Sequence, residues 1–231
     1  MAAIQASAQV GRGRPSMTAT LSSSSGLEVL LSTLQNVGDV ESTLNILSVL
    51  DELLSAGTDR RIHYMIKKGG SEALLTALVK YGHTFSPNYT ILIPLLHLLA
   101  KVGHKDRRIG MKAEEAGAVL LTLNLLKHNG QHARRTAACL WVIQVFCSSV
   151  STANLIGENH GLDVIYRLIP QYTTKHLHAI KAAINAFSAL LCTSKFFYYL
   201  EHSSADVSIF IITIFITIMS QLFLRGHIGN A

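Results

Sequence analysis

Basic side chains recur in pairs along the chain, and they are the residues best suited to recognise another molecule. The string Asp-Arg-Arg-Ile stands at residues 59–62 and again at residues 106–109, 47 positions apart. If successive helical units stack, such pairs align into a ladder of positive charge that suits an acidic peptide. The candidate surface for an acidic partner comprises Arg60, Arg61, Lys67, Lys68, Arg107, Arg108, Lys112, Arg134 and Arg135.

The same pairs also have a structural interpretation, which the sequence favours. In this interpretation Asp59 and Asp106 cap helices, and one arginine of each pair forms an ion pair with the neighbouring unit. Exposed charge pairs usually contribute little free energy, which weighs against a strong binding ladder.

Residues with the spacing of a catalytic or metal site are absent from the sequence. No histidine is followed three positions later by glutamate, and neither a G-x-x-x-x-G-K-[ST] loop nor a G-x-S-x-G elbow occurs. The eleven histidines include two close pairs, but no cysteine or carboxylate accompanies either pair in a ligand pattern. We therefore expect no catalytic residue, no bound metal and no cofactor. The two pairs are His128 with His132 and His176 with His178.

The composition limits the kinds of partner that the chain is expected to bind and the cellular compartment in which it is expected to lie. The net charge of +6 allows a weak attraction to acidic partners, but the basic residues are spread out and no aromatic residues are interleaved for base stacking. We therefore expect a protein partner and no nucleic acid. Cys139, Cys147 and Cys192 lack C-x-x-C spacing and lie in apolar segments, which predicts buried free thiols in a reducing compartment, the cytoplasm.

The elements that position the basic pairs repeat along the chain. Gly26, Gly70, Gly117 and Gly161 each precede an apolar run, at intervals of 44, 47 and 44 residues. Within each run apolar residues recur at i, i+3 and i+4, which predicts a helix. A longer helix, apolar nearly all round, follows each run, and a short polar helix separates the units. The period and composition predict an all-α fold, an armadillo-type α-solenoid of about three three-helix units after an opening helix pair.

Glycines also predict where the longer helices end. Gly57 and Gly103 follow two of these helices, and a glycine can adopt the left-handed conformation that ends a helix. We expect that conformation at both positions.

A resemblance to a known family follows these repeats closely. Residues 26–75, continued by residues 96–113, resemble the N-terminal armadillo region of the cytosolic carboxypeptidases, and the stretch GTDRRIHYMIKKGGSEALL is the most specific part. The resemblance covers residues 26–195. It implies relatives that are zinc carboxypeptidases, which remove glutamates from polyglutamylated tubulin and other acidic tails. Their His-x-x-Glu zinc motif lies in a distant catalytic domain that has no counterpart here, so zinc is expected only in that missing domain.

The two ends depart from the repeat. Residues 1–25 are rich in Ser, Ala and Gly, and we expect a disordered tail there in preference to a mitochondrial transit peptide. Residues 196–231 form a divergent tail, in which residues 207–224 are apolar, uncharged and just long enough to span a membrane. That segment is a membrane anchor, a β-prone aggregating segment, or unrelated sequence after a splice boundary that leaves the solenoid end uncapped. We favour the third interpretation.

Three hypotheses of function follow. The first is a non-catalytic protein-binding module in the cytoplasm, a truncated relative of the carboxypeptidases, whose partners include tubulin or other acidic glutamylated tails. The second is a zinc metallocarboxypeptidase acting in tubulin deglutamylation, as the family resemblance alone would suggest. The third is an adaptor held on a membrane through residues 207–224.

Overall fold

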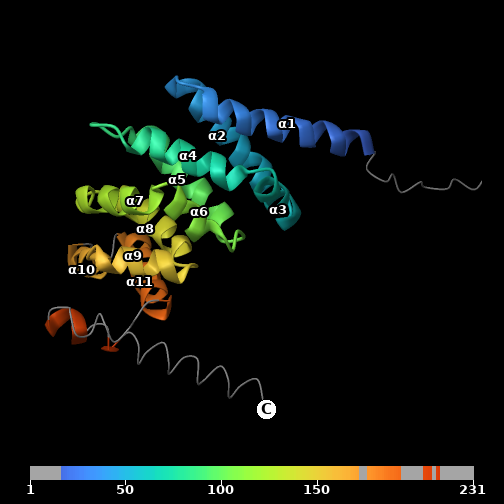
Figure 1. Ribbon diagram of the computed structural model, residues 1–231. Helices are drawn as coiled ribbons and strands as arrows, with labels where there is room; N and C mark the ends of the chain where they lie inside the picture. Colours follow the sequence, from blue (N-terminus) through green and yellow to red (C-terminus); the bar gives the residue numbers. More distant parts are fainter. Residues whose placement is uncertain (1–16, 172–175, 194–204, 210–211, 214–231) are drawn as a thin grey trace, which may run out of the picture.

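The chain folds as a stack of helices. The computed structural model describes residues 17–171, 176–193, 205–209 and 212–213, and within these ranges the regular structure is entirely helical. Figure 1 shows the helices in successive layers, from α1 at one end of an elongated molecule to α11 at the other. The predicted all-α solenoid is confirmed.

The helices group as the sequence period predicts. An opening pair, α1 (Met17–Asn36) and α2 (Val40–Ser55), is followed by three units of three helices, and the third helix of each unit is the longest. The expected order of short, medium and long helix holds in the first two units but not in the third, where α10 has 8 residues and α9 has 9. A short 3-10 turn, η1 (Ile169–Gln171), follows α10. The units are α3 (Asp59–Lys67), α4 (Gly70–Gly82) and α5 (Tyr89–Gly103); α6 (Ile109–Glu115), α7 (Ala118–His128) and α8 (Ala133–Phe146); and α9 (Val150–Glu158), α10 (Gly161–Leu168) and α11 (Leu177–Thr193).

The first helix begins earlier than the sequence predicts. We expected it to open at Gly26 after a tail of residues 1–25, but α1 already begins at Met17. No glycine or proline stands between Pro15 and Gly26, so nothing in that stretch breaks the helix. The remainder of the predicted tail, residues 1–16, lies outside the described residues.

The long helices form the centre of the core. Helix α8 packs between α5 on one side and α11 on the other, and α5 also packs on α2 and α4. Because α8 is covered on both sides, nearly all of its side chains from Thr136 to Phe146 are buried. Phe146 of α8 and Phe187 of α11 are completely buried between these layers. The core is thus continuous through the stack, as an apolar helix without a free face requires.

A residue in the left-handed conformation precedes the second helix of each unit. Gly69 (φ 80°), Gly117 (φ 70°) and His160 (φ 62°) occupy this position before α4, α7 and α10. They turn the chain sharply from the first helix of the unit into the second. Histidine at such a φ costs about 1 kcal/mol relative to glycine, because its Cβ crowds the following carbonyl oxygen.

The prediction for Gly57 and Gly103 is wrong, since among the described glycines only Gly69 and Gly117 have a positive φ. At Gly57 and Gly103 a side chain would instead meet neighbouring atoms. A Cβ on Gly103 would lie 2.8 Å from the Val145 Cγ2 atom of α8, and one on Gly57 would overlap the Arg61 side chain. Close packing against α8 therefore explains glycine at position 103, whereas at position 57 the flexible and exposed Arg61 side chain could move aside.

The divergent tail is described only in part. Among the described residues, no helix combines the length and apolar character that a membrane crossing needs. Most of the predicted segment 207–224 lies outside the described residues, so its interpretation stays a prediction. Val207, however, is only 3% exposed and belongs to the core cluster. At least one residue of the tail therefore packs on the solenoid.

The left-handed position before α10 provides a first test. We expect His160→Gly to raise the free energy of unfolding by about 1 kcal/mol, because glycine removes the Cβ strain. The weak contact between His160 Nδ1 and the Asp163 carboxylate, at 3.7 Å, is lost without much effect because the histidine is exposed. Urea unfolding followed by circular dichroism measures the change.

A matched control exists at the equivalent position before α7. A Cβ added at Gly117 would meet no other atom within 4 Å, so Gly117→Ala introduces backbone strain without a steric clash. We expect this variant to lose about 1 kcal/mol. Equal stabilities of the wild type and both variants would contradict the role assigned to the left-handed residue.

Candidate functional site

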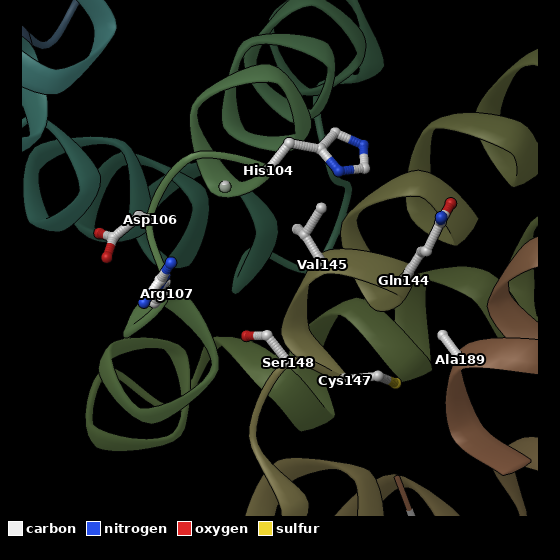
Figure 2. Close-up of a pocket in the computed structure, with 9 residues that line it drawn as sticks. His104, Asp106, Arg107, Gln144, Val145, Cys147, Ser148 and Ala189 are labelled. Carbon is white, nitrogen blue, oxygen red and sulfur yellow. The ribbon is translucent and has the colours of Figure 1, made fainter. Parts of the chain in front are cut away.

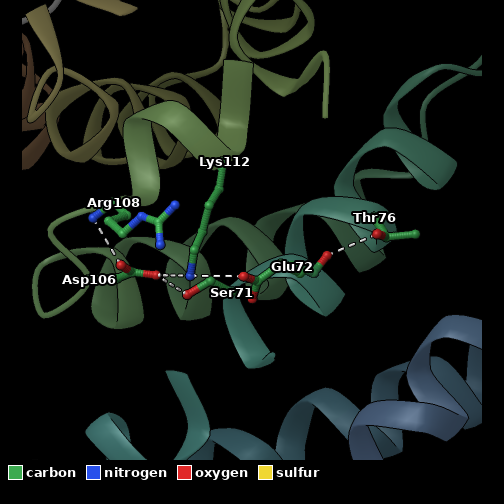
Figure 3. Close-up of polar contacts among 6 residues, drawn as sticks. All are labelled: Ser71, Glu72, Thr76, Asp106, Arg108 and Lys112. Carbon is green, nitrogen blue, oxygen red and sulfur yellow. Dashed lines mark hydrogen bonds and ion pairs between the residues drawn. The ribbon is translucent and has the colours of Figure 1, made fainter. Parts of the chain in front are cut away.

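The second copy of the repeated tetrapeptide lies at the centre of a polar network (Figure 3). Asp106 is 5% exposed and accepts hydrogen bonds from the Ser71 hydroxyl at 2.6 Å, from Lys112 Nζ at 2.7 Å and from the backbone N–H of Arg108 at 3.0 Å. Lys112 also forms an ion pair with Glu72 at 2.9 Å. The network joins α4 of the first unit to the loop and helix α6 of the second.

The electrostatics of this network favour its charged form. Burial acts to raise the pKa of Asp106, but the hydrogen bonds from Lys112, Ser71 and the Arg108 N–H outweigh it and hold that pKa below its ordinary value. Burial likewise acts to lower the pKa of Lys112, but its contacts with Asp106 and Glu72 raise it overall. Both groups are therefore ionised at neutral pH, as a structural ion pair requires.

The first copy of the tetrapeptide behaves differently. Asp59 is the first residue of α3, its side chain is 66% exposed, and it pairs with Lys105 at 2.8 Å. This bridge links the start of α3 to the loop before α6 and so brings the two copies close to one another. Hydrogen bonding to Lys105 lowers the pKa of Asp59.

The structural interpretation of the tetrapeptide needs correction in its details. The N-cap residues of α3 and α6 are Thr58 and Arg108, so neither Asp59 nor Asp106 is a cap as predicted. In the part of the chain that the structure describes, lysines and not arginines make the ion pairs between units. The compact ammonium of Lys112 reaches two carboxylates at once, which suits a buried junction.

Three further candidate residues hold elements together. Lys68, the C-cap of α3, forms an ion pair with Glu28 of α1 at 2.6 Å. The Arg61 guanidinium donates to the backbone oxygen of Leu53 at 3.1 Å. Arg135 stacks on the Tyr89 ring, 4.1 Å from its centroid, a cation–π contact between α8 and the start of α5.

The remaining five candidates are exposed. They are placed on α3, in the loop before α6 and on the first turn of α8, and no side-chain hydrogen bond or ion pair engages them among the described residues. They are therefore the basic side chains available to a partner, namely Arg60, Lys67, Arg107, Arg108 and Arg134.

A hollow beside the second tetrapeptide has no catalytic character. It measures about 340 Å³, lies where the loop after α5 meets the ends of α8 and α11, and is lined in part by Arg107 and Ser148 (Figure 2). The Asp106 carboxylate also borders it but is engaged by Ser71. The Cys147 sulfur points towards Ala189 and is nearly inaccessible. His104 and Ser148 also line the hollow, but among the described residues no side-chain hydrogen bond joins a base to Ser148 or Cys147.

The two described cysteines are buried, and the described residues bring no group of metal ligands together. Cys139 and Cys147 are buried free thiols, as predicted, and burial raises the pKa of each to about 12. The side chain of Cys192 lies outside the described residues. Within the described ranges, no three His, Cys, Asp or Glu side chains converge in a way that would hold a metal ion.

Sequence reasoning missed the partners of these basic residues. Ser71 and Glu72 follow a glycine at the start of α4 and carry no motif of their own. Ser71 meets Asp106 across 35 positions of sequence, a contact that exists only because the two units stack. The one signal in the sequence is that Lys112 follows Asp106 by six positions, on the short helix predicted at the same junction.

Comparison with known proteins places the chain among relatives of much greater length. A family model described as "CCP1-like, N-terminal TPR repeats" matches residues 3–197. Cytosolic carboxypeptidase 4 of Mus musculus is 50% identical over 171 residues, 74% of this chain and 15% of that protein, and the Homo sapiens protein is 52% identical over 167 residues, 72% of this chain and 15% of its own length. Cytosolic carboxypeptidase 1 of Homo sapiens is 38% identical over 172 residues, 74% of this chain and 14% of that protein.

A solved structure supports the fold alone. The crystal structure of an engineered protein superimposes with a TM-score of 0.59 at 19% identity and covers 76% of this chain and 66% of the engineered one. The curated relatives, in contrast, match through a region that makes up only 15% or less of their length.

The two aspartates of the repeated tetrapeptide provide a matched pair of variants. We expect Asp106→Asn to lower the free energy of unfolding by about 2 kcal/mol, because it weakens charged hydrogen bonds inside the junction. Asp59→Asn changes the same residue type in the same tetrapeptide, but on an exposed carboxylate, and should change stability little. Equal effects in urea unfolding would contradict the distinct roles of the two copies.

The lowered pKa of Asp106 also predicts how the stability of the wild type and of Asp106→Asn depends on pH. Because folding lowers the pKa of Asp106, its contribution is complete above the unfolded value of about 3.9 and is lost as the pH falls below that value through the lower folded pKa. We expect the stability difference between the wild type and Asp106→Asn to be constant from pH 5 to 7 and to shrink below pH 4. A difference that grows on acidification would contradict the direction of this pKa shift.

Proposed function

Because this chain belongs to the cytosolic carboxypeptidase family, through its CCP1-like N-terminal repeat region, we propose that it is a non-catalytic helical-repeat module that binds acidic segments of other proteins. Stacked helical repeats present an extended surface, and such surfaces commonly bind other macromolecules. The relatives are named carboxypeptidases, and acidic, glutamate-rich tails of the kind found on tubulin are the partner class that this kinship favours.

The observation that carries the proposal is the Lys105–Asp59 bridge. At 2.8 Å it holds the two copies of the tetrapeptide next to one another, while Arg60, Arg107 and Arg108 remain exposed beside it. Arginines without a carboxylate partner in the fold can offer all of their donors to an external carboxylate. An extended acidic chain is the ligand whose repeating charge suits such a surface.

We further assign the repeat unit to the armadillo type. The left-handed residues Gly69, Gly117 and His160 mark equivalent positions, and each unit has three helices. A tetratricopeptide unit has two helices in about 34 residues, whereas armadillo units take about 40 to 47 residues and two or three helices. The description of the matching family model names TPR repeats, so the assignment rests on the helix count and the period.

We propose binding without hydrolysis, in the cytoplasm. The sequence holds no His-x-x-Glu pair, and the described residues hold no aligned nucleophile and base. No observation on the described residues favours the alternatives of a metallocarboxypeptidase or of a membrane-anchored adaptor.

Charge reversal tests the proposal. We expect Arg60→Glu combined with Arg107→Glu to weaken binding to a glutamylated tubulin-tail peptide by about tenfold, because attraction becomes repulsion at two points of the surface. Fluorescence anisotropy of the labelled peptide at low salt measures the affinity. Added salt should weaken the wild type more than the variant.

The matched control makes the same change of charge elsewhere. Lys127 and Arg167 are exposed neighbours beside a hollow between α7 and α10, and Lys127→Glu with Arg167→Glu should leave the affinity unchanged. Equal loss in both double variants would mean that only net charge matters, and no loss in either would remove the proposed surface. Release of glutamate from the peptide by the purified chain would contradict the non-catalytic assignment.

A further inference from the structure

A groove of about 640 Å³ runs along the first halves of α5 and α8 and reaches the start of α11. None of its lining residues belongs to either copy of the tetrapeptide. Its volume falls in the range of specific ligand sites, enough for a few side chains of a peptide. Its main features are formed by Ile93, His97, His132, Arg134, Trp141 and His178.

The groove has an apolar floor. Arg134, Ala137 and Trp141 lie on one face of α8 at helical spacing, and all three line the groove. Ala137, between the arginine and the indole on this face, carries only a methyl group. Across from it, the His97 ring of α5 lies against Trp141, with ring centroids 5.0 Å apart at 53°. Trp141 is only partly buried and lines the groove.

The charge of the groove has one sign. Two arginines and four histidines contribute to its wall, and no aspartate or glutamate does. Arg135 is engaged by Tyr89, but Arg134 is exposed, and no hydrogen bond or ion pair involves its side chain within the described ranges. The groove therefore offers an uncompensated guanidinium beside an aromatic face.

A buried polar atom in the wall also lacks a partner. His97 Nε2 is shielded from solvent without a hydrogen bond. Burial, together with the charge of Arg134, lowers the pKa of His97, although Asp51 of α2 opposes this, so the ring is neutral at pH 7.

We propose that this groove is a second binding site, separate from the junction arginines, for a peptide segment in which a carboxylate stands next to an aromatic side chain. The carboxylate pairs with Arg134, and the aromatic ring packs on Trp141 above Ala137. Charge complementarity selects this occupant, because the wall is wholly basic and the floor is apolar. Residues 1–16 of the same chain carry two arginines and no acid, so they do not match the groove.

Trp141 is the only tryptophan of the chain, so its fluorescence reports on the groove alone. The probe is the blocked tetrapeptide Glu-Glu-Phe-Glu, which has no tryptophan of its own. We expect a saturable change in Trp141 emission with this peptide, at least tenfold weaker affinity when alanine replaces phenylalanine, and no change with Lys-Lys-Phe-Lys.

Two variants separate this site from the proposed acidic-tail surface. Arg134→Gln should weaken the fluorescence response at least tenfold, and its thermal unfolding should match the wild type because no described residue forms a hydrogen bond or ion pair with the Arg134 side chain. Arg60→Gln with Arg107→Gln should leave the response unchanged. Conversely, binding of a hexaglutamate peptide should depend on Arg60 and Arg107 without altering Trp141 emission. Either proposal can therefore fail while the other stands.

Several results would overturn the second site. They are calorimetric binding of the probe peptide with no change in Trp141 emission, an Arg134→Gln protein that responds like the wild type, and an equal response to the alanine peptide. A saturable change in Trp141 emission with inorganic phosphate or with oligothymidylate would show that the groove binds another anion and not the proposed peptide. A change in Trp141 emission with protein concentration alone would assign the groove to a second copy of this chain.

Discussion

The structure depends on the burial of its long helices from two sides. Helices α5 and α8 are apolar on nearly every face, so neither is stable until a neighbour covers each side. This requirement forces the units into a stack and explains why the core runs through the whole molecule. The short helices are then left at the junctions, where their polar side chains meet across neighbouring units.

The junctions combine an apolar core with a small number of buried charges. The Asp106–Lys112 pair has hydrogen bonds for most of its polar atoms, which offsets the cost of removing it from water. Apolar packing alone tolerates small shifts between helices, whereas this network has one satisfied arrangement. The basic side chains that it does not use, such as Arg60 and Arg107, are the ones left for a partner.

The sequence predicts the elements well and the sites only partly. Apolar periodicity and glycine spacing locate every unit, because both follow from local backbone and packing rules. Identical tetrapeptides could not be told apart, since the burial of Asp106 and the exposure of Asp59 are set by residues in other helices. The left-handed φ of His160 could not be predicted either, because it is set by the geometry of the turn and because residues other than glycine rarely adopt it. The groove at Trp141 could not be predicted, because it is formed only when three helices that are distant in sequence come together.

The junction contacts also bear on how the chain acquires its structure during synthesis. Ser71 meets Asp106 across 35 positions, Asp59 meets Lys105 across 46, and Asp51 meets Lys101 across 50. Every such contact joins neighbouring segments of the stack, so a segment that has left the ribosome can dock as soon as the next one along the chain is synthesised. Short sequence separations also speed folding, because little loop entropy is lost before a contact forms. The stack can therefore grow in the direction of translation, one unit at a time.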